Sequence, residues 1–324
     1  MRRRAFIGLV GGAAAAWTLP ARGQQKTMPV IGFLSPASAD AVVPHKAGFT
    51  LGLGEAGYVV GQNLAIEYRW ADDAYDRLPA LAADLVGRKV DVIVAQAPAA
   101  ARAAKNATTT IPVVFGVGAD PVAEGLVASL ARPGGNLTGV SLLSVDLAAK
   151  RLDLLSELAP GARHFALLVN PNNPNAWIGG LQDRASAKRW QVLILKAASE
   201  AEIDAAFAAI VRHQVQALVI GDDPFLSNKR AQIIQLALRH RIPAIAQYRS
   251  FPDDGGLVSY GSSLKEGYRQ IGLVTAKILR GAKPADLAVQ QPTKFEMVIN
   301  RKTAKALGLT IPPLVLAQAD EVIE

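Results

Sequence analysis

Short apolar runs that alternate with amphipathic runs limit this chain to few folds. The run Val113–Val117 is apolar and rich in β-branched residues, so it predicts a buried strand. Asp120 and Pro121 then suit the N-cap and first turn of a helix, which we expect to extend to about Ala131, before the helix-ending sequence at 133–135. A strand, a loop and a helix in this order are typical of an open α/β sheet, where ligands bind at the carboxyl ends of strands.

The alternation runs along the chain twice. The first series predicts strands at 29–34, 64–70, 90–95 and 113–117, and helices at 45–56, 77–88 and 99–109. The second predicts strands at 164–170, 191–195, 217–221, 243–246, 256–260 and 295–299, and helices at 147–158, 178–189, 200–213, 228–239, 265–279 and 303–307. Parallel strands joined by helices form doubly wound sheets. We therefore expect an α/β fold of two doubly wound, parallel-sheet (Rossmann-like) lobes.

No low-complexity linker separates the two series. Several short crossovers are therefore expected between the lobes, and such a connection acts as a hinge. The predicted first lobe covers 28–140 plus about 260–290. The second covers 141–259 plus about 291–324.

Residues 1–23 have the pattern of a cleavable export signal. Three arginines at 2–4 precede an apolar stretch at 7–19, and Ala21-Arg22-Gly23 places small residues where signal peptidase requires them. The segment 3–7 resembles the twin-arginine motif. A Sec signal with additional arginines is the alternative, and either signal predicts a periplasmic protein.

The chain contains no cysteine. Its fold therefore holds no disulfide, and it has neither a thiol nucleophile nor a thiolate metal ligand. A lipid-modified cysteine is also absent, so we expect a soluble periplasmic protein without a lipid anchor. We expect it to be a monomer.

The charge of the chain argues against nucleic acid as a partner. The formal net charge is +8, but four of the 35 basic residues lie in the first 23 residues, which contain no acid. The remaining 31 basic residues (35 less those four) face 27 acidic ones and are dispersed along the chain. An N-terminal helix-turn-helix motif is lacking as well.

The sequence contains only weak matches to motifs that indicate catalysis or cofactor binding. The glycines of 52–57 match G-x-G-x-x-G, but they fall at the end of a predicted helix, where termination of that helix is the better interpretation. No two of the four histidines have metal-ligand spacing; these are His45, His164, His213 and His240. We therefore expect no metal, no cofactor and no enzyme activity.

Polar residues gather where the predicted strands end. Asp222-Asp223 can hold a ligand ammonium or hydroxyl, or can cap the next helix, and Asp120 has the same two interpretations. The asparagines near 170–175 favour turns, and one or two of them can face a cleft. The candidate ligand-binding residues are Ser35, Ala37, Gln96, Ala97, Pro98, Asp120, Pro121, Asn170, Asn172, Asn175, Asp222, Asp223, Tyr248 and Tyr260.

Several segments together resemble a known family. They lie at 68–70, 77–82, 120–122, 131–139, 168–171, 255–261, 295–300, 304–308 and 319–324. In them the chain is similar to the substrate-binding proteins of ABC transporters with the type I periplasmic-binding fold, in the branch with tryptophan- and tyrosine-binding members.

The resemblance implies a clamp that holds a small solute, such as an aromatic amino acid, between two lobes. The closed form would dock on a membrane permease driven by an ATPase. Ligand loops would follow the strands that end at 34, 95, 117, 169 and 221 and would include 247–260, with crossovers near Val140, Ser259 and Gln290. At 96–98 the chain departs from the family, because many members carry glycine or small hydroxyl residues there.

Two other functions remain open at this stage. One is a ligand-sensing binding protein that reports to a receptor instead of a permease. The other is an exported cofactor enzyme, since twin-arginine substrates often carry cofactors.

Overall fold

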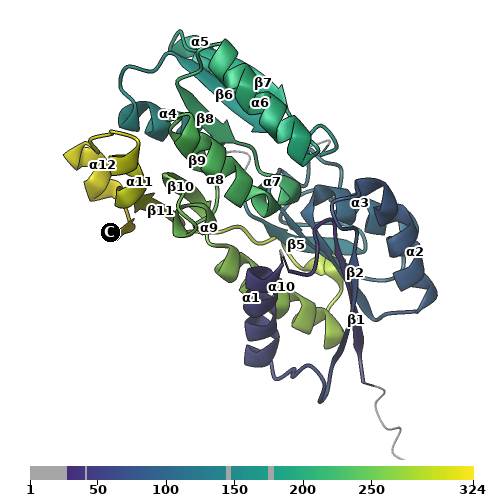
Figure 1. Cartoon of the computed structure of the whole chain (residues 1–324). Helices are drawn as coiled ribbons and strands as arrows, with labels where there is room; N and C mark the ends of the chain where they lie inside the picture. The colour runs from purple at the N-terminus through teal and green to yellow at the C-terminus, as the bar shows by residue number, and fades with distance from the viewer. Residues whose placement is uncertain (1–27, 41, 144–146, 174–178) are drawn as a thin grey trace, which may run out of the picture.

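The computed structural model describes residues 28–40, 42–143, 147–173 and 179–324. It consists of two α/β lobes, each built on its own sheet (Figure 1). Asn175 and the predicted export signal lie outside the described residues.

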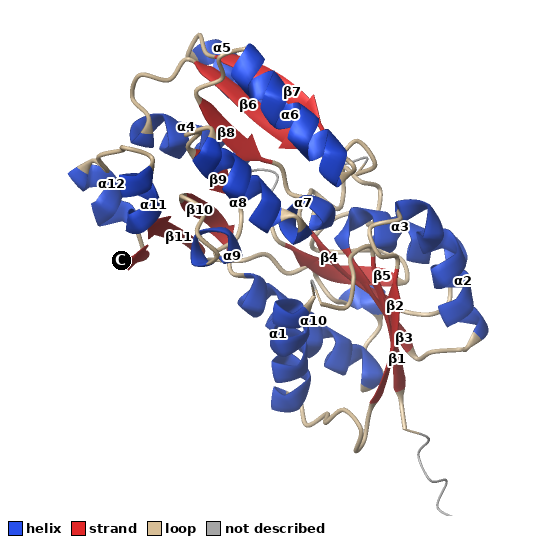
Figure 2. Ribbon diagram, viewed as in Figure 1, coloured by secondary structure: helices blue, strands red, loops and turns tan. Residues whose placement is uncertain are grey.

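The first lobe has a five-stranded sheet in the order β2-β1-β3-β4-β5, and all its strand pairs are parallel. The strands are β1 (Val30–Ser35), β2 (Ala65–Trp70), β3 (Val92–Gln96), β4 (Val113–Val117) and β5 (Leu137–Ser141). Alternate strand residues pack on opposite faces of the sheet. One face is covered by α2 (Leu78–Gly87) and α3 (Ala97–Ala107), and the other by α1 (Val43–Glu55) and α10 (Leu264–Leu279) (Figure 2).

The second lobe has a seven-stranded sheet in the order β12-β11-β10-β9-β8-β6-β7. Its strands are β6 (His164–Val169), β7 (Gln191–Lys196), β8 (Ala217–Ile220), β9 (Ala244–Ala246), β10 (Val258–Ser262), β11 (Phe295–Asn300) and β12 (Glu321–Ile323). One face packs against α4 (Ala148–Leu158), α5 (Gly179–Ala187), α11 (Arg301–Ala306) and α12 (Pro313–Gln318). The other packs against α6 (Glu200–Arg212), α7 (Pro224–Asn228), α8 (Arg230–Arg239) and α9 (Ser250–Asp253).

The chain crosses between the sheets three times: after Ser141, after Ser262 and before Phe295. Hydrogen bonds tie these crossovers together. The Ser262 hydroxyl donates to the Leu142 carbonyl at 3.0 Å, and the Ser141 amide donates to the Gln290 carbonyl at 2.9 Å. The crossovers therefore lie side by side between the lobes, and α10 returns to the first lobe.

The predicted fold class is confirmed, with two local corrections. The helix predicted from Pro121 to Ala131 is wrong, because the segment forms turns. The Asp120 carboxylate accepts the Val122 amide at 2.8 Å, and Gly125 takes a left-handed φ of 64° that an α-helix excludes. The second sheet is also not wholly parallel, since β11 runs antiparallel to β10.

The glycines of the G-x-G-x-x-G sequence have separate roles. Gly57 adopts a φ of 82° just after α1, as expected of a residue that terminates a helix. Gly52 lies where α1 crosses α10, and a Cβ there would be 2.0 Å from the Arg269 carbonyl oxygen. Gly54 has open space around it. Close packing of α1 on α10 therefore requires a glycine at position 52 but not at position 54.

We predict opposite effects from two alanine substitutions in α1. Gly52→Ala is expected to lower the free energy of unfolding by about 1–3 kcal/mol, because the two helices must move apart. Gly54→Ala is expected to raise it by about 0.4–1 kcal/mol, because alanine restricts the unfolded chain. Denaturant unfolding of both variants measures the difference. Equal effects would contradict the assigned close approach.

Candidate functional site

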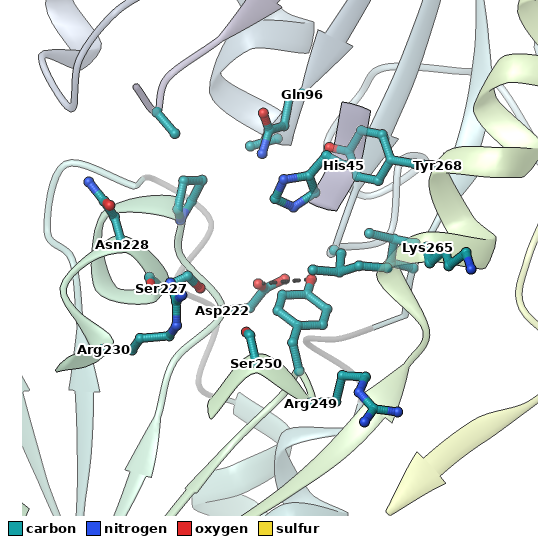
Figure 3. Close-up of a pocket in the computed structure, with 18 of the residues that line it drawn as sticks. His45, Gln96, Asp222, Ser227, Asn228, Arg230, Arg249, Ser250, Lys265 and Tyr268 are labelled. Atoms are coloured by element: carbon teal, nitrogen blue, oxygen red, sulfur yellow. Dashed lines mark hydrogen bonds between the residues drawn. The ribbon is translucent and has the colours of Figure 1, made fainter. Parts of the chain in front are cut away.

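A cleft of about 660 Å³ lies between the two lobes (Figure 3). The first lobe contributes the ends of β3 and β4 and the first turns of α1, α3 and α10. The second contributes the loop after β8 together with residues of α7, α8 and α9. This volume is within the range of about 300–1,000 Å³ that small-molecule sites occupy.

The first-lobe wall is largely uncharged. The His45 and Tyr268 rings meet edge to face, with their centroids 4.6 Å apart. Burial lowers the pKa of His45 to about 4, although a hydrogen bond with the Val42 backbone opposes the change, so the imidazole is neutral at pH 7. The charged residues on this wall, Asp40 and Lys265, are exposed.

Gln96 and Ala97 form an unusual junction between β3 and α3. Gln96 is only 6% exposed, yet it lines the cleft. Ala97 adopts a φ of 65°, a left-handed conformation that costs a non-glycine residue about 1 kcal/mol or more. No side chain caps the N-terminus of α3. Strain of this kind collects at binding sites, where the surrounding structure maintains it.

The second-lobe wall has a carboxylate near its centre. Asp222 points into the cleft (Figure 3) and is half-buried. It accepts hydrogen bonds from Gln247 Nε2 at 3.1 Å and from the Tyr248 hydroxyl at 3.2 Å. Its negative charge acts across the cleft, because it adds to burial in raising the pKa of Tyr268. It also opposes the effect of burial, which lowers the pKa of Arg151 in α4.

Asp223 is turned away from the cleft and is only 2% exposed. Its carboxylate accepts hydrogen bonds from Asn170 Nδ2, Asn173 Nδ2 and the Leu226 amide, each at 3.1 Å. The last of these caps α7. The adjacent pair therefore divides the two predicted roles, because Asp222 faces the cleft and Asp223 caps a helix.

Two further hydrogen bonds join the lobes, and of their four residues only Asn228 also lines the cleft. The Tyr75 hydroxyl donates to Asp223 Oδ2 at 2.8 Å. Asn228 Nδ2 donates to Asp73 Oδ2 at 3.1 Å. Tyr75 and Asp73 follow β2 in the first lobe, whereas their partners follow β8 in the second. We call these two bonds the interlobe latch.

The predicted ligand residues fall into two groups. Those that line the cleft are Ala37, Gln96, Ala97, Pro98, Asp222 and Tyr248. The others described lie outside its lining: Ser35, Asp120, Pro121, Asn170, Asn172, Asp223 and Tyr260. Ser35, for example, is fully buried and accepts the Ala37 amide at 3.0 Å, while Asp120 is exposed in its turn.

Sequence reasoning missed several lining residues, among them His45, Ser227, Arg230 and Tyr268, whereas Asn173 belongs to the asparagine cluster from which one or two residues were expected to face the cleft. His45 lies in the first turn of α1 and Tyr268 is the fifth residue of α10, so the start of a predicted helix after a strand was the available signal. Within the described part of the chain, no group of His, Asp and Glu residues is placed to hold a metal ion. No described helix is both long and apolar enough to cross a membrane.

Comparison with known proteins places these features in a family. The family model for "ABC transporter substrate binding protein" matches residues 30–323. A tyrosine-binding protein of Clostridioides difficile (strain R20291) is 30% identical over 267 residues, which cover 82% of this chain and 76% of that protein.

Solved structures agree with this match. A conserved domain protein of Vibrio cholerae has a TM-score of 0.84 and is 28% identical in sequence. A Streptococcus pneumonia ABC domain in complex with L-Trp has a TM-score of 0.82 and is 26% identical. The ligand-free, open structure of a Clostridium difficile substrate-binding protein with adhesive properties has a TM-score of 0.64 and is 27% identical. Each comparison covers 91% of this chain and 99% of the other. The chain therefore belongs to the family of ABC transporter substrate-binding proteins and has their type I periplasmic-binding fold.

Proposed function

We propose that this chain is the substrate-binding component of an ABC importer and that it clamps an aromatic amino acid between its lobes. The observation that carries the proposal is the interlobe cleft, which has a half-buried carboxylate on one wall and neutral, ring-bearing residues on the other. Relatives named for tyrosine binding or solved with L-Trp support this ligand class. Export by residues 1–23 to the periplasm and delivery to a permease are part of the proposal.

The cleft offers partners for each part of such a ligand. Asp222 supplies a counter-charge for the ammonium group. Ser227 on the same wall supplies a hydroxyl donor suited to the carboxylate. His45 and Tyr268 on the opposite wall supply ring surfaces that suit an aromatic side chain.

Closure of the two lobes explains how binding is signalled to a permease. The chain fits the L-Trp-bound relative better than the open one, at TM-scores of 0.82 and 0.64, although the two identities are nearly equal at 26% and 27%. We infer that the lobes are in the closed arrangement here, with the interlobe latch formed. A ligand that contacts both walls stabilises this arrangement over an open one, and a permease can distinguish the two shapes.

Thermal unfolding of the mature protein against single amino acids tests the proposal. L-Tyrosine or L-tryptophan at 100 times its Kd is expected to stabilise the protein by about 2.7 kcal/mol and to raise the unfolding midpoint. L-Lysine serves as the control, because its side chain has no ring and its second ammonium would lose water against the largely uncharged first-lobe wall. If no aromatic amino acid shifts the midpoint, the proposed ligand class is wrong.

A further inference from the structure

Gln96 has a buried acceptor that faces the cleft. The side chain is 6% exposed, and its Oε1 atom accepts no hydrogen bond from any described residue. Buried carbonyl oxygens are almost always paired in folded proteins. Because Gln96 lines the cleft, a molecule bound there can supply the missing donor.

The surroundings of Gln96 show which kind of donor suits it. The residues that follow Gln96 in the chain, Ala97 and Pro98, and its partner on β4, Gly116, also line the cleft and carry no side-chain charge. A cationic group held here would lose its water without gaining a counter-charge, which is unfavourable. A neutral hydroxyl or ring N–H meets no such penalty and pairs well with an amide oxygen.

The ammonium group of an amino acid has a better partner elsewhere. Asp222, on the opposite wall, is the carboxylate near the centre of the cleft. The same wall also carries Asp253, which pairs with Arg249 at 3.1 Å, Asp254, which pairs with Arg230 at 2.5 Å, and Glu296, whereas the carboxylate of the first-lobe wall, Asp40, is exposed. The charged end of the ligand therefore belongs on the second-lobe wall, and its side chain extends toward Gln96.

From this division of charge we propose that Gln96 is a specificity-determining residue that accepts a hydrogen bond from a donor on the ligand's aromatic ring. The ligand class is then an aromatic amino acid with a ring donor, the phenol O–H of tyrosine or the indole N–H of tryptophan. Phenylalanine has a similar shape but leaves Oε1 unpaired. This inference rests on the proposed function and refines it.

Sites that hydrogen-bond a ligand hydroxyl or N–H discriminate strongly against analogues without that group, because a buried partner stays unsatisfied. We expect the wild-type protein to bind L-tyrosine or L-tryptophan about 10- to 100-fold more tightly than L-phenylalanine. Whichever of L-tyrosine and L-tryptophan binds more tightly shows which ring donor reaches Gln96 Oε1. Many members of the family carry glycine or a small hydroxyl residue in this segment, and such a residue at position 96 could not reach as far toward the ligand ring as a glutamine side chain does.

Isothermal titration of the three amino acids against two variants tests the role of Gln96. Gln96→Met keeps the length of the side chain but removes the acceptor, so the preference over L-phenylalanine should fall to within about threefold. Tyr248→Phe is the matched control, because it alters the opposite wall. It should change all three affinities by a similar factor and preserve the preference.

The outcomes separate this inference from the proposed function. If the wild-type protein binds none of the three amino acids, the proposed function itself fails. If it binds L-phenylalanine as tightly as the other two, the function stands and the role of Gln96 is wrong. A preference that survives in Gln96→Met, or that collapses equally in Tyr248→Phe, also overturns the assignment.

Discussion

Replacing Asp222 with asparagine is expected to weaken the binding of an aromatic amino acid by about 100-fold, as measured by isothermal titration. The ammonium group would lose its counter-charge, and a hydrogen bond to a charged group contributes about 1.5–3 kcal/mol. The fold should persist, because Asp222 is half-buried and an asparagine carbonyl can still accept from Gln247 and Tyr248.

A ligand without the ammonium group provides the control. The deaminated analogue, an arylpropanoate, should bind the Asp222→Asn variant at least as well as the wild type, because it has no positive charge for Asp222 to neutralise. If Asp222→Asn weakens the analogue and the amino acid equally, Asp222 acts on the shape of the site. If it weakens neither, the ammonium group is held by another residue.

Much of the architecture follows from local sequence patterns. The strand Val113–Val117 was predicted with its observed bounds, because a buried central strand leaves a continuous apolar run. The helix predicted after it fails because Gly125 and the Asp120 turn redirect the chain, and an N-cap residue suits such a turn as well as a helix. The direction of β11 could not be predicted, because a single strand pattern is the same in parallel and antiparallel pairs.

The residues of the cleft show more clearly that local sequence patterns do not predict tertiary contacts. Strand ends located Gln96 and Asp222, because parallel strands bring their carboxyl ends to one edge. His45 and Tyr268 come together only because α1 packs closely on α10, at residues far apart in the sequence. Which aspartate of the pair 222–223 faces the cleft depends on where α7 begins, and that boundary shifts by a residue or two in any sequence-based prediction.

Replacing Asp223 with alanine is expected to lower the free energy of unfolding by about 3 kcal/mol. The change leaves the amides of Asn170, Asn173 and Leu226 without their acceptor, and each buried unpaired group costs about 1–3 kcal/mol. It also removes the bond from Tyr75 across the lobes. Denaturant unfolding measures the loss, and a change below about 1 kcal/mol would contradict this role.

Asp223→Asn separates charge from hydrogen bonding. Burial raises the pKa of Asp223, although hydrogen bonds from Tyr75, Leu226, Asn170 and Asn173 oppose the rise. The folded state therefore takes up a proton at a higher pH than the unfolded state does, so the stability contributed by this shift is complete below the unfolded pKa and is lost as pH rises through the folded pKa. Relative to Asp223→Asn, the wild type should thus gain stability as pH falls through the folded pKa of Asp223.

Tyr75→Phe removes one of the two bonds of the interlobe latch, because it deletes the hydroxyl that donates to Asp223 and keeps the ring. Neither Tyr75 nor Asp223 lines the cleft, so the variant should lower the affinity for every ligand by the same factor, about 3- to 10-fold, through a smaller closed population. Small-angle scattering of the ligand-free protein should show a larger radius of gyration than in the wild type. Unchanged affinity together with an unchanged radius would mean that this bond contributes nothing to closure, whereas a change in the ratio of affinities would mean that it shapes the site itself.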